Sequence, residues 1–171
     1  ELIEAYKHLH EDETKFTGIS LIPFAIDLYS IIQFNKCQSI LDYGCGKATA
    51  YKENFKDIDP KKRIPNFTVP LHNWWGVYDL SLYDPGVPEH STFPTKTADI
   101  VICTDVLEHI PEEDLDWLIR EICSLANTTV FLNISCQLAK KTFTSGKYKG
   151  ENVHVSVFDH AWWVDKIKTI H

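Results

Sequence analysis

Apolar residues along the chain follow two patterns, short runs and longer stripes with helical spacing. The runs are continuous or alternating and are bounded by turn residues, which is typical of strands. We expect these strands at residues 39–43, 77–83, 98–103 and 128–135. The run at 98–103 is apolar on both of its faces, as the buried strands of a parallel sheet are.

The helical stripes lie between these runs. Residues 1–36 are amphipathic with a break near residues 17–18, and residues 47–56 carry one apolar face. A further helix begins at Pro111, because proline is favoured at the first helical position and three acidic residues follow it. A last helix begins at about Asp159. Strands that alternate with helices predict an α/β fold with a doubly wound, mostly parallel sheet.

Length, charge and cysteine content narrow the class of protein. The 171 residues have the size of one domain, 1–171, and the formal net charge of −7 disfavours generic nucleic-acid binding. No apolar run approaches the length of a membrane span. The five cysteines form no C-x-x-C pair, so we expect reduced thiols in a cytoplasmic protein. The chain begins at Glu1 and contains no methionine, from which we expect trimmed ends.

A turn with two glycines, Leu41 to Ala48, follows the first predicted strand. In parallel sheets ligands bind beyond the carboxyl ends of the strands, where glycines allow close approach and a helix N-terminus offers N–H groups. Asp42 lies inside the strand end, where a carboxylate needs a cationic or hydrogen-bonding partner. Asp84 ends the next strand, where it can accept the hydroxyl groups of a ribose.

This pattern differs from the fingerprint of nicotinamide-dependent enzymes. In that fingerprint an acidic residue follows the glycines by about 20 residues, and a third glycine opens the helix. Here Gly46 and Asp84 are farther apart, and Thr49 occupies the place of the third glycine. The sequence therefore disfavours a nicotinamide oxidoreductase.

Three motifs in a fixed order carry a family resemblance. They are Asp42-x-Gly44-x-Gly46, Tyr83-Asp84-Pro85, and the run 98–115 with Leu107-Glu108-His109-Ile110-Pro111. Together they resemble the first motif, the second strand end, and the fourth strand with its loop of class I S-adenosylmethionine-dependent methyltransferases. The resemblance covers roughly residues 37–165, and the tail with Asn152-Val153-His154 is similar to small bacterial and phage-type members. It implies a Rossmann-like cofactor-binding core at 37–165 behind an N-terminal helical segment at 1–36.

The resemblance implies S-adenosylmethionine as the cofactor and assigns residues to its parts. Those expected to wrap the methionine part are Asp42, Tyr43, Gly44, Cys45 and Gly46. Asp84 would hold the ribose hydroxyls, and Pro85 would lie beside the adenine. The amino-acid end would be lined by Cys103, Thr104 and Asp105. The N-terminal segment would close over the cofactor with Phe16, Gly18 and Ser20.

The sequence departs from the family's pattern at three places. Ala48 stands where the family usually has its third glycine. Residues 85–97 are too few for the usual helix and third strand, so we expect that strand to be short or absent. The chain stops at His171, before the family's final antiparallel hairpin, which we expect to be missing. The resemblance thus predicts a reduced sheet.

Glu108, His109 and His154 are the candidates for substrate contact and catalysis, because they follow the family's fourth and fifth strands. In a structural interpretation, Glu108 and His109 cap the next helix and hold the loop. In a second interpretation they supply a general base or an acceptor-orienting pair. In a third they bind a metal, since the set loosely resembles the ligands of RNA 3′-end 2′-O-methyltransferases, with Asp replacing the first Glu. The metal interpretation is the least favoured of the three.

The acceptor side carries a cluster of four lysines, Lys140, Lys141, Lys147 and Lys149. Such a cluster is usually a solvated loop, but beside a site it can also steer an anionic acceptor. The leading prediction is an enzyme that methylates O or N of a small-molecule or sugar acceptor, with neither nucleic acid nor membrane as a partner. The alternative is a non-catalytic S-adenosylmethionine-binding module of a larger complex, which the short segment after Asp84 favours.

Overall fold

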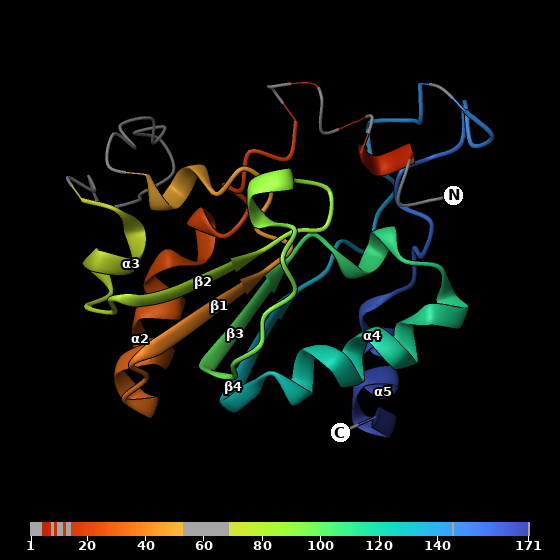
Figure 1. Cartoon of the computed structure of the whole chain (residues 1–171). Helices are drawn as coiled ribbons and strands as arrows, with labels where there is room; N and C mark the ends of the chain where they lie inside the picture. Colours follow the sequence, from red (N-terminus) through yellow and green to blue (C-terminus); the bar gives the residue numbers. More distant parts are fainter. Residues whose placement is uncertain are drawn as a thin grey trace.

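The computed structural model of the protein describes residues 5–7, 9, 12, 15–52, 69–144 and 146–170. Its centre is a parallel sheet with the strand order β2-β1-β3-β4. The strands are β1 (Ser39–Tyr43), β2 (Asp79–Tyr83), β3 (Ala98–Thr104) and β4 (Ala126–Asn133). Figure 1 shows them side by side with their carboxyl ends at one edge. The predicted α/β class with a parallel sheet is confirmed.

One face of the sheet is covered by α2 (Ala25–Asn35), which follows a 3-10 turn at Ile22–Phe24, and by the short helix α3 (Leu71–Trp74) (Figure 1). The indole N–H of Trp75 donates to the carbonyl of Ala25 at 2.9 Å, so this large buried side chain has its polar atom satisfied. The core on this face combines helix and strand positions: Leu28, Ile32, Trp75, Ile40, Ile100 and Ile102.

The opposite face is covered by α4 (Glu112–Ser124) and α5 (His160–Ile170). α4 starts directly after Pro111 and buries the predicted apolar stripe, Leu115, Leu118, Ile119 and Ile122. Helices on both faces of the sheet produce a three-layer α/β arrangement. Among the described helices, none combines the length and the hydropathy of a membrane span.

One of the predicted helices differs from the structure. The helix expected at 47–56 is a single 3-10 turn, Thr49–Tyr51, and residues 53–56 lie outside the described residues. The turn ends where Lys52 adopts extended backbone, with φ −86° and ψ 147°. The N–H groups of Lys47 and Thr49 pair with the carbonyls of Phe16 and Thr17, a contact with a distant segment that helical spacing cannot reveal.

The connection from β2 to β3 is short, as its length predicted. Residues 84–97, all of which the structure describes, contain only the 3-10 turn Pro88–His90 and no further helix or strand. The order β2-β1-β3 means that the chain leaves β1 toward one side and later returns past it to the other. At such a switch point the loops beyond the strands diverge, which leaves room for a ligand.

The N-terminal segment and the segment after β4 meet above this edge of the sheet. Leu9, Phe143 and Val153 form a small buried cluster there, with Tyr6 and Phe16 packed against it. Figure 1 shows the red N-terminal segment beside the blue chain that leads to α5. Residues from opposite ends of the chain thus close over the carboxyl ends of the strands.

Candidate functional site

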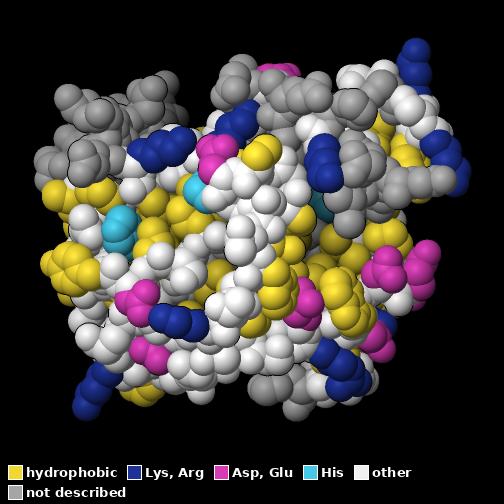
Figure 2. Space-filling model, viewed as in Figure 1, with side chains coloured by type: hydrophobic (Ala, Val, Ile, Leu, Met, Phe, Trp, Pro, Cys, Tyr) yellow, Lys and Arg dark blue, Asp and Glu magenta, His cyan; other side chains and the backbone are white. Residues whose placement is uncertain are grey.

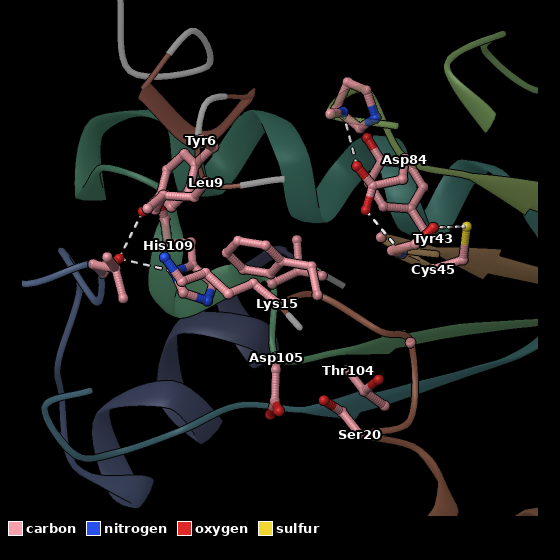
Figure 3. A pocket seen from close by; sticks show the side chains of 18 of the residues that line it. Tyr6, Leu9, Lys15, Ser20, Tyr43, Cys45, Asp84, Thr104, Asp105 and His109 are labelled. Carbon is pink, nitrogen blue, oxygen red and sulfur yellow. Dashed lines mark hydrogen bonds between the residues drawn. The ribbon is translucent and has the colours of Figure 1, made fainter. Parts of the chain in front are cut away.

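A cavity of about 660 Å³ lies at the carboxyl ends of β1, β2 and β3. Small-molecule sites commonly measure about 300–1,000 Å³, so this size suits a cofactor or metabolite. Figure 3 shows Tyr6 and His109 at one end of the cavity and Asp84, Tyr43 and Cys45 at the other. In the same view Thr104 and Ser20 lie close together from different parts of the chain.

Most of the predicted site residues line this cavity. From the set expected around the cofactor they are Asp42, Tyr43, Gly44, Cys45, Gly46, Asp84, Pro85, Thr104 and Asp105. The N-terminal segment contributes Phe16, Gly18 and Ser20, and the segments after β3 and β4 contribute His109 and His154. Cys103 and Glu108 do not line the cavity.

Cys103 lies in the core instead of in the predicted cofactor site. Successive side chains of a strand point to opposite faces of the sheet, so Thr104 and Cys103 diverge. The Cys103 side chain packs in the cluster under α4, where burial raises the pKa of its thiol well above the usual value. Because its side chain points to the other face of the sheet, Cys103 does not line the cavity, although the motif had included it among the cofactor-binding residues.

The glycines of the turn allow close contact inside the protein. Gly44 and Gly46 have φ of +83° and +55°. A Cβ on Gly46 would lie 2.3 Å from the carbonyl oxygen of Phe16, and one on Gly44 would lie 2.2 Å from Cγ2 of Val106. The protein's own packing therefore requires glycine at both positions, which also line the cavity, and the approach of a ligand there stays a prediction.

The backbone N–H groups of this turn are also bound within the protein. Those of Gly44 and Cys45 donate to the carbonyl of Tyr83, and that of Lys47 donates to the carbonyl of Phe16. The expected helix N-terminus with available N–H groups is therefore wrong, since the following element is a 3-10 turn. The lining carboxylates of Asp42 and Asp84 are the charged groups of this region.

Asp42 is the most unusual of these carboxylates. It is 1% exposed, and its Oδ2 accepts the hydroxyl of Tyr51 at 2.9 Å. Its Oδ1 is buried and has no hydrogen-bond partner among the described residues. Burial raises the pKa of Asp42 to about 7, the Tyr51 bond opposes this shift, and the charge of Asp84 adds to it. The predicted partner exists as Tyr51, which the sequence did not single out.

Asp84 ties together the turns that follow β1 and β2. Its Oδ2 accepts the N–H of Gly46 at 2.9 Å, and its Oδ1 accepts the N–H of Gly86 at 2.8 Å. Asp84 therefore shapes the glycine turn and lines the cavity, and its role in holding a ribose stays a prediction.

Asp105 stands at the cavity edge in a strained conformation. Its φ is +55°, in the left-handed region that residues with a side chain seldom occupy. Asn133 maintains it: the Asn133 amide donates to the Asp105 carboxylate at 2.8 Å, and the Asn133 carbonyl accepts the Asp105 N–H at 3.0 Å. Strain held in this way is common at functional sites. The sequence offered no sign of Asn133, which lies at the end of β4.

Two imidazoles line the other end of the cavity. Nδ1 of His109 lies 2.8 Å from the carbonyl of Val153, and Nδ1 of His154 lies 2.6 Å from the carbonyl of Gln137. Because a carbonyl can only accept, each Nδ1 carries a proton, and the lone pair of the neutral ring is on Nε2. The two rings meet edge to face with centroids 4.8 Å apart.

Tyr6 supports this pair from the N-terminal segment. Its hydroxyl bonds to the Val153 carbonyl at 2.6 Å and to the His109 carbonyl at 3.1 Å. The Tyr6 and His109 rings pack edge to face at 5.3 Å (Figure 3). No motif marked Tyr6, because its partners are more than a hundred residues away in the chain.

Glu108 holds the loops behind the site. It is fully buried, and its Oε1 accepts the N–H of Ser135 at 2.9 Å. Its backbone carbonyl accepts the N–H groups of Val155 and Ser156. Burial raises its pKa to about 7. Glu108 thus holds the loops, as the structural interpretation predicted, but it does not cap α4, which has Pro111 at its N-cap and no side-chain cap. The described residues contain no group of three His, Cys, Asp or Glu side chains arranged to hold a metal ion.

No protein-family model, curated protein or solved structure matches the chain. A functional assignment therefore depends on the side chains of the cavity together with the motif resemblance. Those side chains divide into carboxylates at the strand ends and imidazoles and lysines on the opposite wall.

Proposed function

We propose that the protein is an S-adenosylmethionine-dependent methyltransferase with a Rossmann-like fold that acts on O or N of a small acceptor. The observation that carries the proposal is Asp42, a buried carboxylate on the cavity whose Oδ1 has no partner among the described residues. Such a group is costly unless a ligand brings a donor or a positive charge. S-adenosylmethionine brings both, in its ammonium and sulfonium groups.

The residues present suit this cofactor in kind and in order. Asp42 and the glycine turn would meet the methionine part, and Asp84, a carboxylate on the same cavity, would hold the ribose hydroxyls. Phe16, Gly18 and Ser20 line the same cavity from the N-terminal segment. When bound, the cofactor supplies a methyl group on a sulfonium, which is already activated for attack.

The protein's own task is then to orient the acceptor, exclude water and take up a proton. Orientation of two reactants in a closed site can account for several kcal/mol of a barrier. A neutral imidazole with its proton on Nδ1 can accept the acceptor's proton at Nε2 as the new bond forms. His109 is our candidate for this role, since Val153 and Tyr6 hold its ring on the cavity.

A non-catalytic S-adenosylmethionine-binding module is the second candidate. The segment 84–97 lacks the helix and strand that usually follow the acidic residue, which favours a specialised or reduced protein. Incubation of a cell lysate with tritiated cofactor and the protein separates the two. The enzyme transfers label to an acceptor, and a His109→Gln variant transfers markedly less, whereas a binding module transfers none.

Calorimetric titration with S-adenosylmethionine tests the cofactor assignment. Because Asp42 ionises at about pH 7, affinity should rise between pH 6 and pH 8, by up to about tenfold per unit below its pKa. Asp42→Asn should weaken binding and remove this slope. Asp79→Asn, an exposed carboxylate at the opposite end of β2, is the control. Lack of binding by the folded protein, or equal effects of the two variants, would contradict the proposal.

A further inference from the structure

One wall of the cavity is built from the segment between β4 and α5. Asn152 holds this segment together, because its Oδ1 accepts the N–H groups of Ala139 at 3.1 Å and His154 at 2.9 Å. Its Nδ2 donates to the Ala139 carbonyl at 2.9 Å. Buried apolar side chains of the same segment pack on Leu9. Residues 139–141 therefore have a defined place on the cavity beside His154.

The structure divides the four lysines of this segment into two pairs. Lys140 and Lys141 line the cavity, whereas Lys147 and Lys149 do not. Lys147 lies over the ring of Tyr148, with its Nζ 5.7 Å from the centroid. Lys140 and Lys141 are exposed, and within the described part of the chain neither forms an ion pair or a hydrogen bond through Nζ. Two cations thus face the cavity without a counter-charge.

Side chains of opposite charge therefore line one cavity. The lining carboxylates belong to the strand ends, and the lining lysines belong to the two segments that close over them: Asp42, Asp84 and Asp105 against Lys15, Lys140 and Lys141. Lys15 pairs with Asp12 at 3.3 Å, so the uncompensated charge is that of Lys140 and Lys141. Figure 2 shows a Lys or Arg side chain next to a histidine in the upper part of the visible face.

From this division we infer that the methyl acceptor carries an anionic group, a phosphate or a carboxylate, which Lys140 and Lys141 bind. A pair of uncompensated cations on a protein of net charge −7 concentrates anions at that place. The anion site stands by itself, and its role in holding an acceptor rests on the proposed function. The carboxylates of Asp42, Asp84 and Asp105 on the same cavity repel an anion, so the lysines are where its charge is held.

A small acceptor fits these observations better than a nucleic acid. A polymer of phosphates is bound by several lysines or arginines spread along a surface, and each neutralised phosphate adds to the salt dependence. Here the two cations that matter are adjacent in sequence and line a cavity with three carboxylates. One anionic group on a compact molecule satisfies them.

Calorimetry with inorganic phosphate and, separately, with succinate tests the inference on the full chain. We expect saturable binding of at least one probe, weakened at least about tenfold in the double variant K140A/K141A, which loses two charge-assisted contacts. The double variant K147A/K149A removes the same charge from the same loop and should bind within about twofold of the unmodified protein. Thermal melting of both variants checks that they are folded.

Titration of S-adenosylmethionine into the same samples keeps the two proposals separate. Cofactor binding unchanged in K140A/K141A, with the anion lost, supports the inference. An anion that binds to a protein with no affinity for the cofactor would overturn the proposed function and leave the anion site standing. Absence of saturable binding by both probes, equal loss in both double variants, or tighter binding of a single-stranded oligonucleotide than of either probe would overturn the inference.

Discussion

Two buried carboxylates, Asp42 and Glu108, are chemically alike but occupy different places in the protein. Both have one oxygen bonded and one buried oxygen without a partner among the described residues, and burial raises both pKa values to about 7. Asp42 lines the cavity, where a ligand can supply the missing donor, whereas Glu108 lies behind the site and holds backbone N–H groups. Location, and not the carboxylate itself, separates a ligand-binding group from a structural one.

Glu108→Gln should therefore change stability in a pH-dependent way. A carboxyl whose folded pKa is raised contributes stability that is present below the unfolded value of about 4.5 and is lost as the pH rises through about 7. The side chain of the Glu108→Gln variant cannot ionise, so the variant does not lose this stability. Its free energy of unfolding, compared with that of the unmodified protein, should therefore increase from pH 5 to pH 8. Urea unfolding at each pH measures the difference in the free energy of unfolding. Within that window the difference should change by up to about 1.4 kcal/mol per pH unit.

An exposed residue provides the comparison for Glu108. Glu112→Gln, in the first turn of α4, should show no such trend, because that side chain is solvated in both states. Parallel pH curves for the Glu108 and Glu112 variants would show that Glu108 ionises normally in the folded protein.

At the scale of elements, the decisive contact joins the N-terminal segment to the glycine turn. The carbonyls of Phe16 and Thr17 accept N–H groups from Lys47 and Thr49, and Gly18 lies directly against the backbone of Cys45. This pairing occupies N–H groups that the motif predicted for a ligand. It also brings Phe16 and Gly18 onto the cavity. The N-terminal segment is thus part of the site and not an appendage to it.

Gly18→Ala tests this contact, because a Cβ there would lie 2.2 Å from the Cys45 carbonyl oxygen and Gly18 has φ +75°. We expect a loss of unfolding free energy well above the roughly 1–2 kcal/mol that a left-handed alanine costs by itself. Gly76→Ala is the matched control, since Gly76 has φ +77° but no atom within 4 Å of its Cβ position. Urea unfolding and cofactor titration of both variants provide the measurement, and equal losses would show that the contact does not matter.

At the scale of the whole molecule, the sheet has a protected centre and two less protected edges. β1 and β3 each pair with strands on both sides, and their side chains are almost all buried between the helical layers. β2 and β4 each pair with a single strand among the described residues, and their side chains are half-buried or exposed. The site lies where the two central strands end, so a stable centre supports it.

Hydrogen exchange followed by mass spectrometry should reproduce this order. Amides of β1 and β3 should exchange only on global unfolding, whereas those of β2 and β4 should exchange sooner through local opening. Addition of S-adenosylmethionine should slow exchange throughout if it binds the folded state alone. Equal protection of all four strands in the ligand-free protein would show that the edges are covered by contacts other than those described.

Local patterns were sufficient to predict the elements that carry the sheet. β1 and β3 agree with their predicted ranges, and α4 with its predicted start, to within one residue, because apolar runs and the Pro111 helix start act over a few neighbouring residues. The predicted strands at 77–83 and 128–135 differ from β2 and β4 by two residues at some ends, where a half-buried pattern marks the boundary weakly. The motifs also predicted correctly that Asp42, Asp84 and Asp105 meet at one cavity.

The sequence by itself therefore determined the α/β class, the parallel sheet and the cluster of acidic residues at its edge, since each depends on local spacing. The tertiary structure alone decided which polar atoms have hydrogen-bond partners and which side chains face the cavity or the core. It paired Asp42 with Tyr51, joined Tyr6 to His109 through Val153, and turned Cys103 into the core. It also placed Lys140 and Lys141 on the cavity and kept the other two lysines off it. The physical reason is that these contacts join residues far apart in the chain, or depend on strand parity and loop path, which no local pattern encodes.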